Sequence, residues 1–278
     1  MRIELRGLTA RHPAARAGAA PALTELGLCI EPGEQVAVIG PSGAGKTTLL
    51  QVLGLSMQPA QGTLDLDGGN PWALSHRQRQ RLRGRLFLAP QVPPLPPRQR
   101  VVTSVLAGQL PSLSLLASLR SLFYPRDIAA AFDALEAFDA GDKLFDRVDR
   151  LSGGERQRVG LARALVSPAR LWLVDEPLSA LDPARSRLAI ETVTGRARAA
   201  GITLVATLHQ VDVALAHFPR VIGLRDGRLA FDLPSREVTP QRLARLYEQF
   251  EHELRGQVPA PADEGSATRP APVVMHCR

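Results

Sequence analysis

Residues 40–48 read GPSGAGKTT and decide the fold. The pattern G-x-x-x-x-G-K-[ST] is complete here, and it lies between an apolar run, QVAVIG, and a helical pattern, TTLLQVLGL. A strand before this motif and a helix after it are typical of a phosphate-binding loop, whose free backbone N–H groups surround the phosphates. The Lys46 ammonium can reach the β- and γ-phosphates, and the Thr47 hydroxyl can bind Mg²⁺. The expected nucleoside triphosphate contacts are Gly40, Pro41, Ser42, Gly43, Ala44, Gly45, Lys46, Thr47 and Thr48.

Outward from this loop, apolar runs alternate with helical patterns. Residues 171–177 (LWLVDEP) and 202–209 (ITLVATLH) are typical of strands buried on both faces, and helical patterns lie before and between them. This order favours a parallel sheet flanked by helices. Residues 1–70 contain alternating strand patterns, whereas residues 92–150 combine a proline-rich connector with helices and predict a helical insertion.

The apolar run at 171–174 ends in two acidic residues, Asp175 and Glu176. Where a strand ends the backbone turns, so that both carboxylates can face one ligand. Asp175 suits a water-mediated contact with Mg²⁺, and Glu176 suits the general base that polarises an attacking water.

A second glycine-rich helix start follows the insertion, at residues 151–158 (LSGGERQR). Such a helix start attracts anions through its free N–H groups and the helix dipole. The chain therefore has two candidate phosphate sites.

These motifs, together with SALD (179–182) and LHQ (208–210), occur in the order and spacing of ABC-transporter ATPase subunits, and the chain resembles that family over residues 1–235. The resemblance implies an α/β fold with a P-loop NTPase (RecA-like) core, an N-terminal antiparallel β subdomain and an inserted α-helical subdomain. The implied divisions of one ABC ATPase domain (1–255) are a core with the β subdomain (1–91 and 158–235), a helical subdomain (92–157) and a C-terminal helix (236–255). Residues 256–278 have the composition of a disordered tail.

The resemblance also implies roles for individual residues. Gln91 matches the Q-loop glutamine, which would sense Mg²⁺ and a membrane partner; Asp182 matches the D-loop aspartate, which would contact the opposite subunit. His209 matches the switch histidine, which would hydrogen-bond the γ-phosphate. The implied catalytic residues are Lys46, Glu176 and His209, and the implied Mg²⁺ contacts are Thr47, Gln91 and Asp175.

Two copies packed head to tail would explain the second glycine-rich helix start. Each copy would close the other's site in a C₂ homodimer, with ATP between them. The residues implied to contact the partner's ATP are Ser152, Gly153, Gly154 and Glu155.

The sequence departs from the family pattern in its first loop. These ATPases usually stack adenine on an aromatic residue just after the first strand, but no Phe, Trp or Tyr precedes Trp72. His12 lies at the matching place, either as a smaller stacking surface with weak base discrimination or as an exposed loop residue.

Composition limits the cellular setting. No apolar run approaches the length of a membrane span, and the N-terminus lacks the apolar core of a signal peptide, so we expect a cytoplasmic protein. Two distant cysteines give no disulfide framework, and Cys29 is expected to be a buried small residue. The net charge is +7, but the arginines are scattered, which favours coding bias over a nucleic-acid partner.

Residues 105–123 and 208–232 resemble phosphonate-importer ATPase subunits. This implies an ATPase that powers uptake of a phosphonate or related oxyanion through a permease, fed by an extracytoplasmic solute-binding protein. It also implies peripheral attachment at the cytoplasmic face of a bacterial inner membrane. The alternative is a soluble accessory subunit of a phosphonate-degrading assembly. A chromosome or DNA-repair ATPase is disfavoured because the insertion lacks the sustained heptads of long coiled-coil arms.

Overall fold

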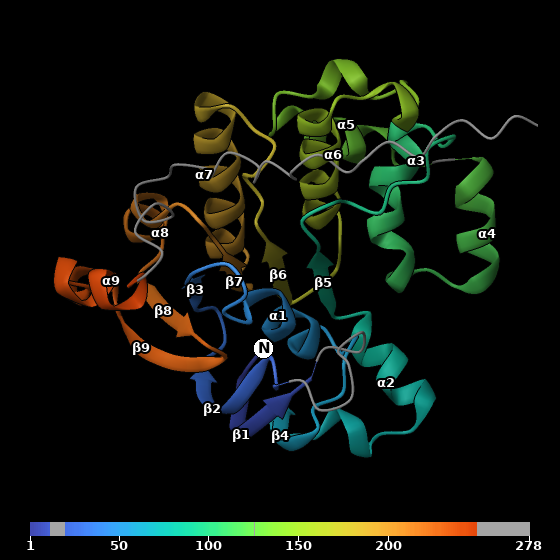
Figure 1. The fold of residues 1–278 in the computed structure, drawn as a ribbon. Coiled ribbons are helices and arrows are strands. Elements are labelled where there is room, and N and C mark those ends of the chain that lie inside the picture. The colour runs from blue at the N-terminus through green and yellow to red at the C-terminus, as the bar shows by residue number, and fades with distance from the viewer. Residues whose placement is uncertain (12–19, 125, 249–278) are drawn as a thin grey trace, which may run out of the picture.

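The computed structural model describes residues 1–11, 20–124 and 126–248, which form two sheets with helices packed around them (Figure 1). The strands are β1 (Ile3–Ala10), β2 (Leu23–Ile30), β3 (Gln35–Ile39), β4 (Gln61–Leu66), β5 (Leu86–Ala89), β6 (Leu171–Asp175), β7 (Thr203–Thr207), β8 (Arg220–Arg225) and β9 (Arg228–Pro234). The helices include α1 (Lys46–Leu53), α2 (His76–Arg83), α3 (Val101–Leu106), α4 (Leu115–Phe123), α5 (Ile128–Glu136), α6 (Gly153–Leu165), α7 (Pro183–Ala199), α8 (Val211–His217) and α9 (Pro240–Leu246). No helix in these ranges is both long enough and apolar enough to cross a membrane.

The larger sheet has the strand order β5-β6-β7-β3-β8-β9. The first five strands in this order, β5, β6, β7, β3 and β8, pair in parallel, and β9 is antiparallel to β8 at one edge. Every residue of β3, β6 and β7 is buried, as their continuous apolar runs predict. The P-loop strand β3 thus lies at the centre of the sheet, and its loop opens at the carboxyl edge.

Alternate residues of these strands pack into two separate cores. Val36 and Val38 of β3 face a core shared with α1 and the smaller sheet. Ala37 and Ile39 face the opposite core, which contains residues of α3 and α5 to α8. This arrangement confirms the predicted α/β fold with helices on both faces of a largely parallel sheet.

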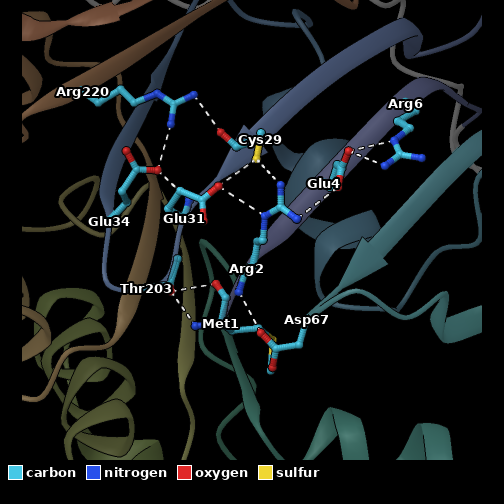
Figure 2. Close-up of polar contacts among 10 residues, drawn as sticks. All are labelled: Met1, Arg2, Glu4, Arg6, Cys29, Glu31, Glu34, Asp67, Thr203 and Arg220. Atoms are coloured by element: carbon cyan, nitrogen blue, oxygen red, sulfur yellow. Dashed lines mark hydrogen bonds and ion pairs between the residues drawn. The ribbon is translucent and has the colours of Figure 1, made fainter.

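The smaller sheet, β2-β1-β4, is antiparallel, and in addition to the shared core it meets the larger sheet through polar contacts (Figure 2). Thr203 Oγ1 accepts the Met1 amino group and donates to the Met1 carbonyl, both at 2.9 Å. Arg220 pairs with Glu34 at 2.9 Å and donates to the Cys29 carbonyl at 2.8 Å. The Cys29 side chain is half-buried beside Glu31, so the expectation of a fully buried residue was wrong.

The insertion is helical, with α3, the 3₁₀ turn η2 (Ala107–Ser112), α4 and α5 following an irregular connector. Its predicted boundary between residues 157 and 158 falls inside α6, which begins at Gly153. In place of one helix over 236–255, the structure has η5 (Ser235–Glu237) and α9, and residues 249–278, including the predicted tail, lie outside the described residues.

Candidate functional site

The P-loop joins β3 to α1 through two tightly confined glycines. Gly40 has φ +151°, and a Cβ there would lie 2.1 Å from the Leu224 carbonyl oxygen. Gly45 has φ +98° and caps α1, and its Cβ would lie 2.4 Å from the Ala22 carbonyl oxygen. Only glycine combines this conformation with so close a backbone approach, which explains the spacing of the motif.

Lys46 is the first residue of α1, and its side chain folds back over the loop. It is only 5 % exposed, and its Nζ donates to the carbonyls of Gly40 at 2.7 Å and Pro41 at 3.2 Å. These bonds compensate the burial of the ammonium and hold it over the loop.

Tyr247, directly after α9, forms a hydrogen bond with the P-loop although it is far from it in the sequence. Its side chain is 1 % exposed, and its hydroxyl accepts the Gly40 N–H at 3.2 Å. Sequence reasoning missed this residue, because no local motif marks a contact across 207 positions.

A hollow of about 230 Å³ lies beside the loop. It is lined by P-loop residues together with Glu176 and His209, so the structure brings together the three residues predicted to be catalytic. Its lining comprises Ser42, Gly43, Ala44, Gly45, Lys46, Thr47, Thr48, Glu176 and His209.

Both oxygens of the Glu176 carboxylate are engaged. His209 Nε2 lies 2.6 Å from Oε1, and Gln91 Nε2 donates to Oε2 at 2.7 Å. Burial raises the pKa of Glu176, but the hydrogen bond and charge of His209 and the charge of Lys46 outweigh it and hold that pKa below its usual value. Glu176 is therefore ionised at neutral pH, as a general base must be.

The backbone turn after β6 places the two carboxylates differently. Glu176 has φ +46°, and its N–H donates to Thr207 Oγ1 at 2.9 Å. Thr207 in turn donates to Asp175 Oδ1 at 2.6 Å, and Asp175 is 4 % exposed. A positive φ is unusual for a non-glycine residue, and here it directs Glu176 into the hollow while Asp175 stays in the sheet.

The start of α6 does not line this hollow. Ser152 caps the helix in a reciprocal capping box: its Oγ accepts the Glu155 N–H at 3.3 Å, and its own N–H donates to Glu155 at 2.7 Å. Gly153 instead lines a separate hollow of about 540 Å³ that also contains Gln91. The second glycine-rich helix start is thus folded, with Ser152 and Gly153 exposed, but it does not line this chain's own P-loop hollow.

A further predicted residue, Asp182, does not line the P-loop hollow. Asp182 caps α7, accepting the Arg185 N–H at 3.0 Å and pairing with the Arg185 guanidinium. The Arg185 backbone bond is the main reason that the pKa of Asp182 lies below its usual value. His12 lies outside the described residues.

The residues present fit a magnesium–nucleotide complex. A Cβ at Gly40 or Gly45 would collide with a neighbouring backbone carbonyl, so this loop conformation requires glycine at both positions, and Lys46 supplies a fixed positive charge beside it. A Thr47 hydroxyl and an Asp175 carboxylate are hard oxygen donors of the kind Mg²⁺ prefers beside phosphates.

A central parallel sheet, a phosphate-binding loop and a strand-end glutamate together define a P-loop nucleotide-binding protein. Residues 23–179 match the family model described as ABC transporter, and the chain belongs to this family.

Two relatives match over the whole of both chains. The chain is 66 % identical to Phosphonates import ATP-binding protein PhnC 2 of Albidiferax ferrireducens and 63 % identical to Phosphonates import ATP-binding protein PhnC of a Polaromonas species. Among solved structures, the dimeric structure of MJ0796, a bacterial ABC transporter cassette, aligns with a TM-score of 0.71 at 25 % identity. That alignment covers 85 % of this chain and all of the other.

Proposed function

We propose that this chain is the ATP-hydrolysing subunit of an ABC importer and that it powers phosphonate uptake through a membrane permease. The observation that carries the proposal is the full-length similarity, at 66 % and 63 % identity, to two phosphonates import ATP-binding proteins. The site supports it, because Lys46, Glu176 and His209 line one hollow beside a complete phosphate loop.

In this proposal each residue has a separate task. Lys46 binds the β- and γ-phosphates, Glu176 accepts a proton from the attacking water, and His209 hydrogen-bonds the γ-phosphate. Thr47, Asp175 and Gln91 would hold Mg²⁺, which neutralises negative charge on the phosphates. Gln91 and His209 each engage one Glu176 oxygen, and each oxygen keeps a second lone pair that can accept from the attacking water.

Two copies complete each other's sites in the proposed homodimer. Ser152, Gly153, Gly154 and Glu155 lie outside the chain's own P-loop hollow, as residues that contact a nucleotide on the partner would. Asp182 would contact the opposite subunit once the copies meet.

The helical insertion is the proposed surface for the permease. Leu115 and Leu116 of α4 are each 79 % exposed, and Leu119 is 51 % exposed, which gives this helix an uncovered apolar face. Exposed apolar patches of this kind mark protein–protein contact sites. The chain would then lie peripherally at the cytoplasmic face of the inner membrane, and a solute-binding protein would select the substrate on the other side.

The test is purification of the tagged full-length chain from solubilised membranes. A multi-span permease should copurify, and phosphonate-loaded binding protein should stimulate ATP hydrolysis in the reconstituted complex. Recovery of soluble phosphonate-degrading enzymes without a permease would instead support the accessory-subunit alternative.

His12 is proposed to stack on adenine, although weakly. His12→Tyr should then tighten ATP binding about twofold to tenfold and increase the preference for ATP over GTP, because a larger ring stacks better. Titration of both nucleotides with the wild-type and variant proteins measures this. Unchanged affinity for both nucleotides would contradict the proposed stacking.

The catalytic unit is proposed to end between Tyr247 and the tail. A chain that stops at residue 255 should keep full ATPase activity, because it retains the Tyr247–Gly40 bond.

Tyr247→Phe should lower the free energy of unfolding by about 1–3 kcal/mol, since it leaves a buried N–H without that acceptor. Denaturant unfolding measures this effect, and an unchanged midpoint would show that the bond contributes little.

A further inference from the structure

The acidic residues are distributed very unevenly along the chain. Between Asp67 and Asp127 lie 59 residues with no Asp or Glu and with nine arginines. The remaining 25 basic and 27 acidic residues leave the rest of the chain at a formal charge of −2. The whole excess of positive charge therefore belongs to one continuous segment, a pattern that coding bias toward arginine does not explain.

Five of these arginines lie in or just after α2. Three of them have a polar or aromatic partner, and two have none among the described residues. Arg79 stacks on Trp72, with its guanidinium 5.1 Å from the ring centroid, and Arg83 donates to the Leu55 carbonyl at 2.6 Å. Arg85 pairs with Asp67 at 3.0 Å. Arg77 and Arg81 are exposed and have no polar partner within the described ranges.

Arg77 and Arg81 are four residues apart, so they lie on the same side of α2. Like charges at this spacing destabilise a helix. The capping box at Ser75 and Gln78 stabilises the helix start, but α2 contains no acidic residue that could compensate the pair. We call Arg77 and Arg81 the basic surface of α2.

The basic surface adjoins the proposed permease surface. A groove of about 800 Å³ joins the end of α2 to η2, with Arg81 and Arg83 on one side and Leu110 and Pro111 on the other. The 3₁₀ turn η2 leads directly into α4 and its exposed leucines, and α2 and α4 flank the same margin of the molecule in Figure 1. In the proposed complex, the basic surface of α2 would therefore lie beside the permease.

We propose that the basic surface of α2 binds the phosphates of anionic lipid headgroups beside the permease. This inference rests on the proposed function, which places the chain at a membrane. Charge complementarity supports it, because anionic leaflets attract clustered arginines over a distance set by ionic strength.

The experiment measures binding of the full-length chain to vesicles made of phosphatidylcholine alone or of equal parts phosphatidylcholine and phosphatidylglycerol. Wild-type protein should sediment only with the anionic vesicles and should be released as the salt is raised. Arg77→Gln/Arg81→Gln should bind about 25-fold more weakly, roughly fivefold for each arginine. The control, Arg196→Gln/Arg198→Gln, removes the same charge from exposed positions in the last turn of α7.

The outcomes separate the competing explanations. Equal binding to both vesicle types, or equal losses in the two double variants, would overturn the proposal. Loss of binding to an RNA oligonucleotide with unchanged vesicle binding would assign the surface to nucleic acid and also overturn it. Permease copurification is scored separately, so failure of vesicle binding alone contradicts the lipid contact and leaves the importer assignment intact.

Discussion

Glu176→Gln is expected to bind ATP with near-normal affinity, to hydrolyse it about 10²–10⁴-fold more slowly, and to accumulate as a dimer. The substitution removes the general base but preserves shape. An amide at this position can still accept from His209 through its oxygen, and Gln91 can rotate its own amide to face the new NH₂ group. The hollow beside the P-loop should therefore remain intact.

Size exclusion with and without ATP and magnesium measures the dimer, and phosphate release measures hydrolysis. Lys46→Ala is the matched control: it lacks the ammonium that binds the phosphates, so it should stay monomeric in ATP. If Glu176→Gln binds ATP but elutes as a monomer, the proposed head-to-tail dimer is wrong.

Ser152→Arg should bind ATP at its own P-loop yet neither dimerise nor hydrolyse it. The residue does not line the chain's own hollow, and a long cationic side chain would occupy the space needed by the partner's nucleotide. The change also removes an N-cap bond, which costs about 1 kcal/mol of stability. Ser152→Gly controls for the cap, because glycine is tolerated there and adds no bulk.

Mixing two inactive chains gives the sharper test. Ser152→Arg retains an intact P-loop, and Lys46→Ala retains an intact Ser152. Their heterodimer contains one complete site only if Ser152 acts on the partner's nucleotide. Hydrolysis should therefore return in the mixture, whereas no recovery would place Ser152 in its own chain's site.

The fully buried strands were predictable because their sequences are uniformly apolar. β3, β6 and β7 were identified in this way, and the P-loop and the strand-end acids followed from their positions after β3 and β6. The strands at or near the sheet edges were not. β5 has only four residues, and β9 has an exposed, partly polar pattern without clear alternation.

Helix α2 was not predicted from the sequence, and α4 was predicted only as part of the helical insertion. α2 buries no residue and therefore has no apolar period, and α4 exposes its leucines where a core helix would bury them.

In the candidate site, motifs located the residues but not their contacts. The hydrogen bond between Gln91 and Glu176 joins residues 85 positions apart, and the Tyr247–Gly40 bond joins two ends of the domain. Such contacts depend on how the elements pack, which local patterns do not encode.

The central position of β3 also has a consequence for synthesis. β3 and the P-loop leave the ribosome early, but both neighbours of β3, β7 and β8, are made only after residue 200. Tyr247 follows later still. A nascent chain therefore carries the whole phosphate motif long before it has the sheet that frames it, so incomplete chains should not compete for ATP.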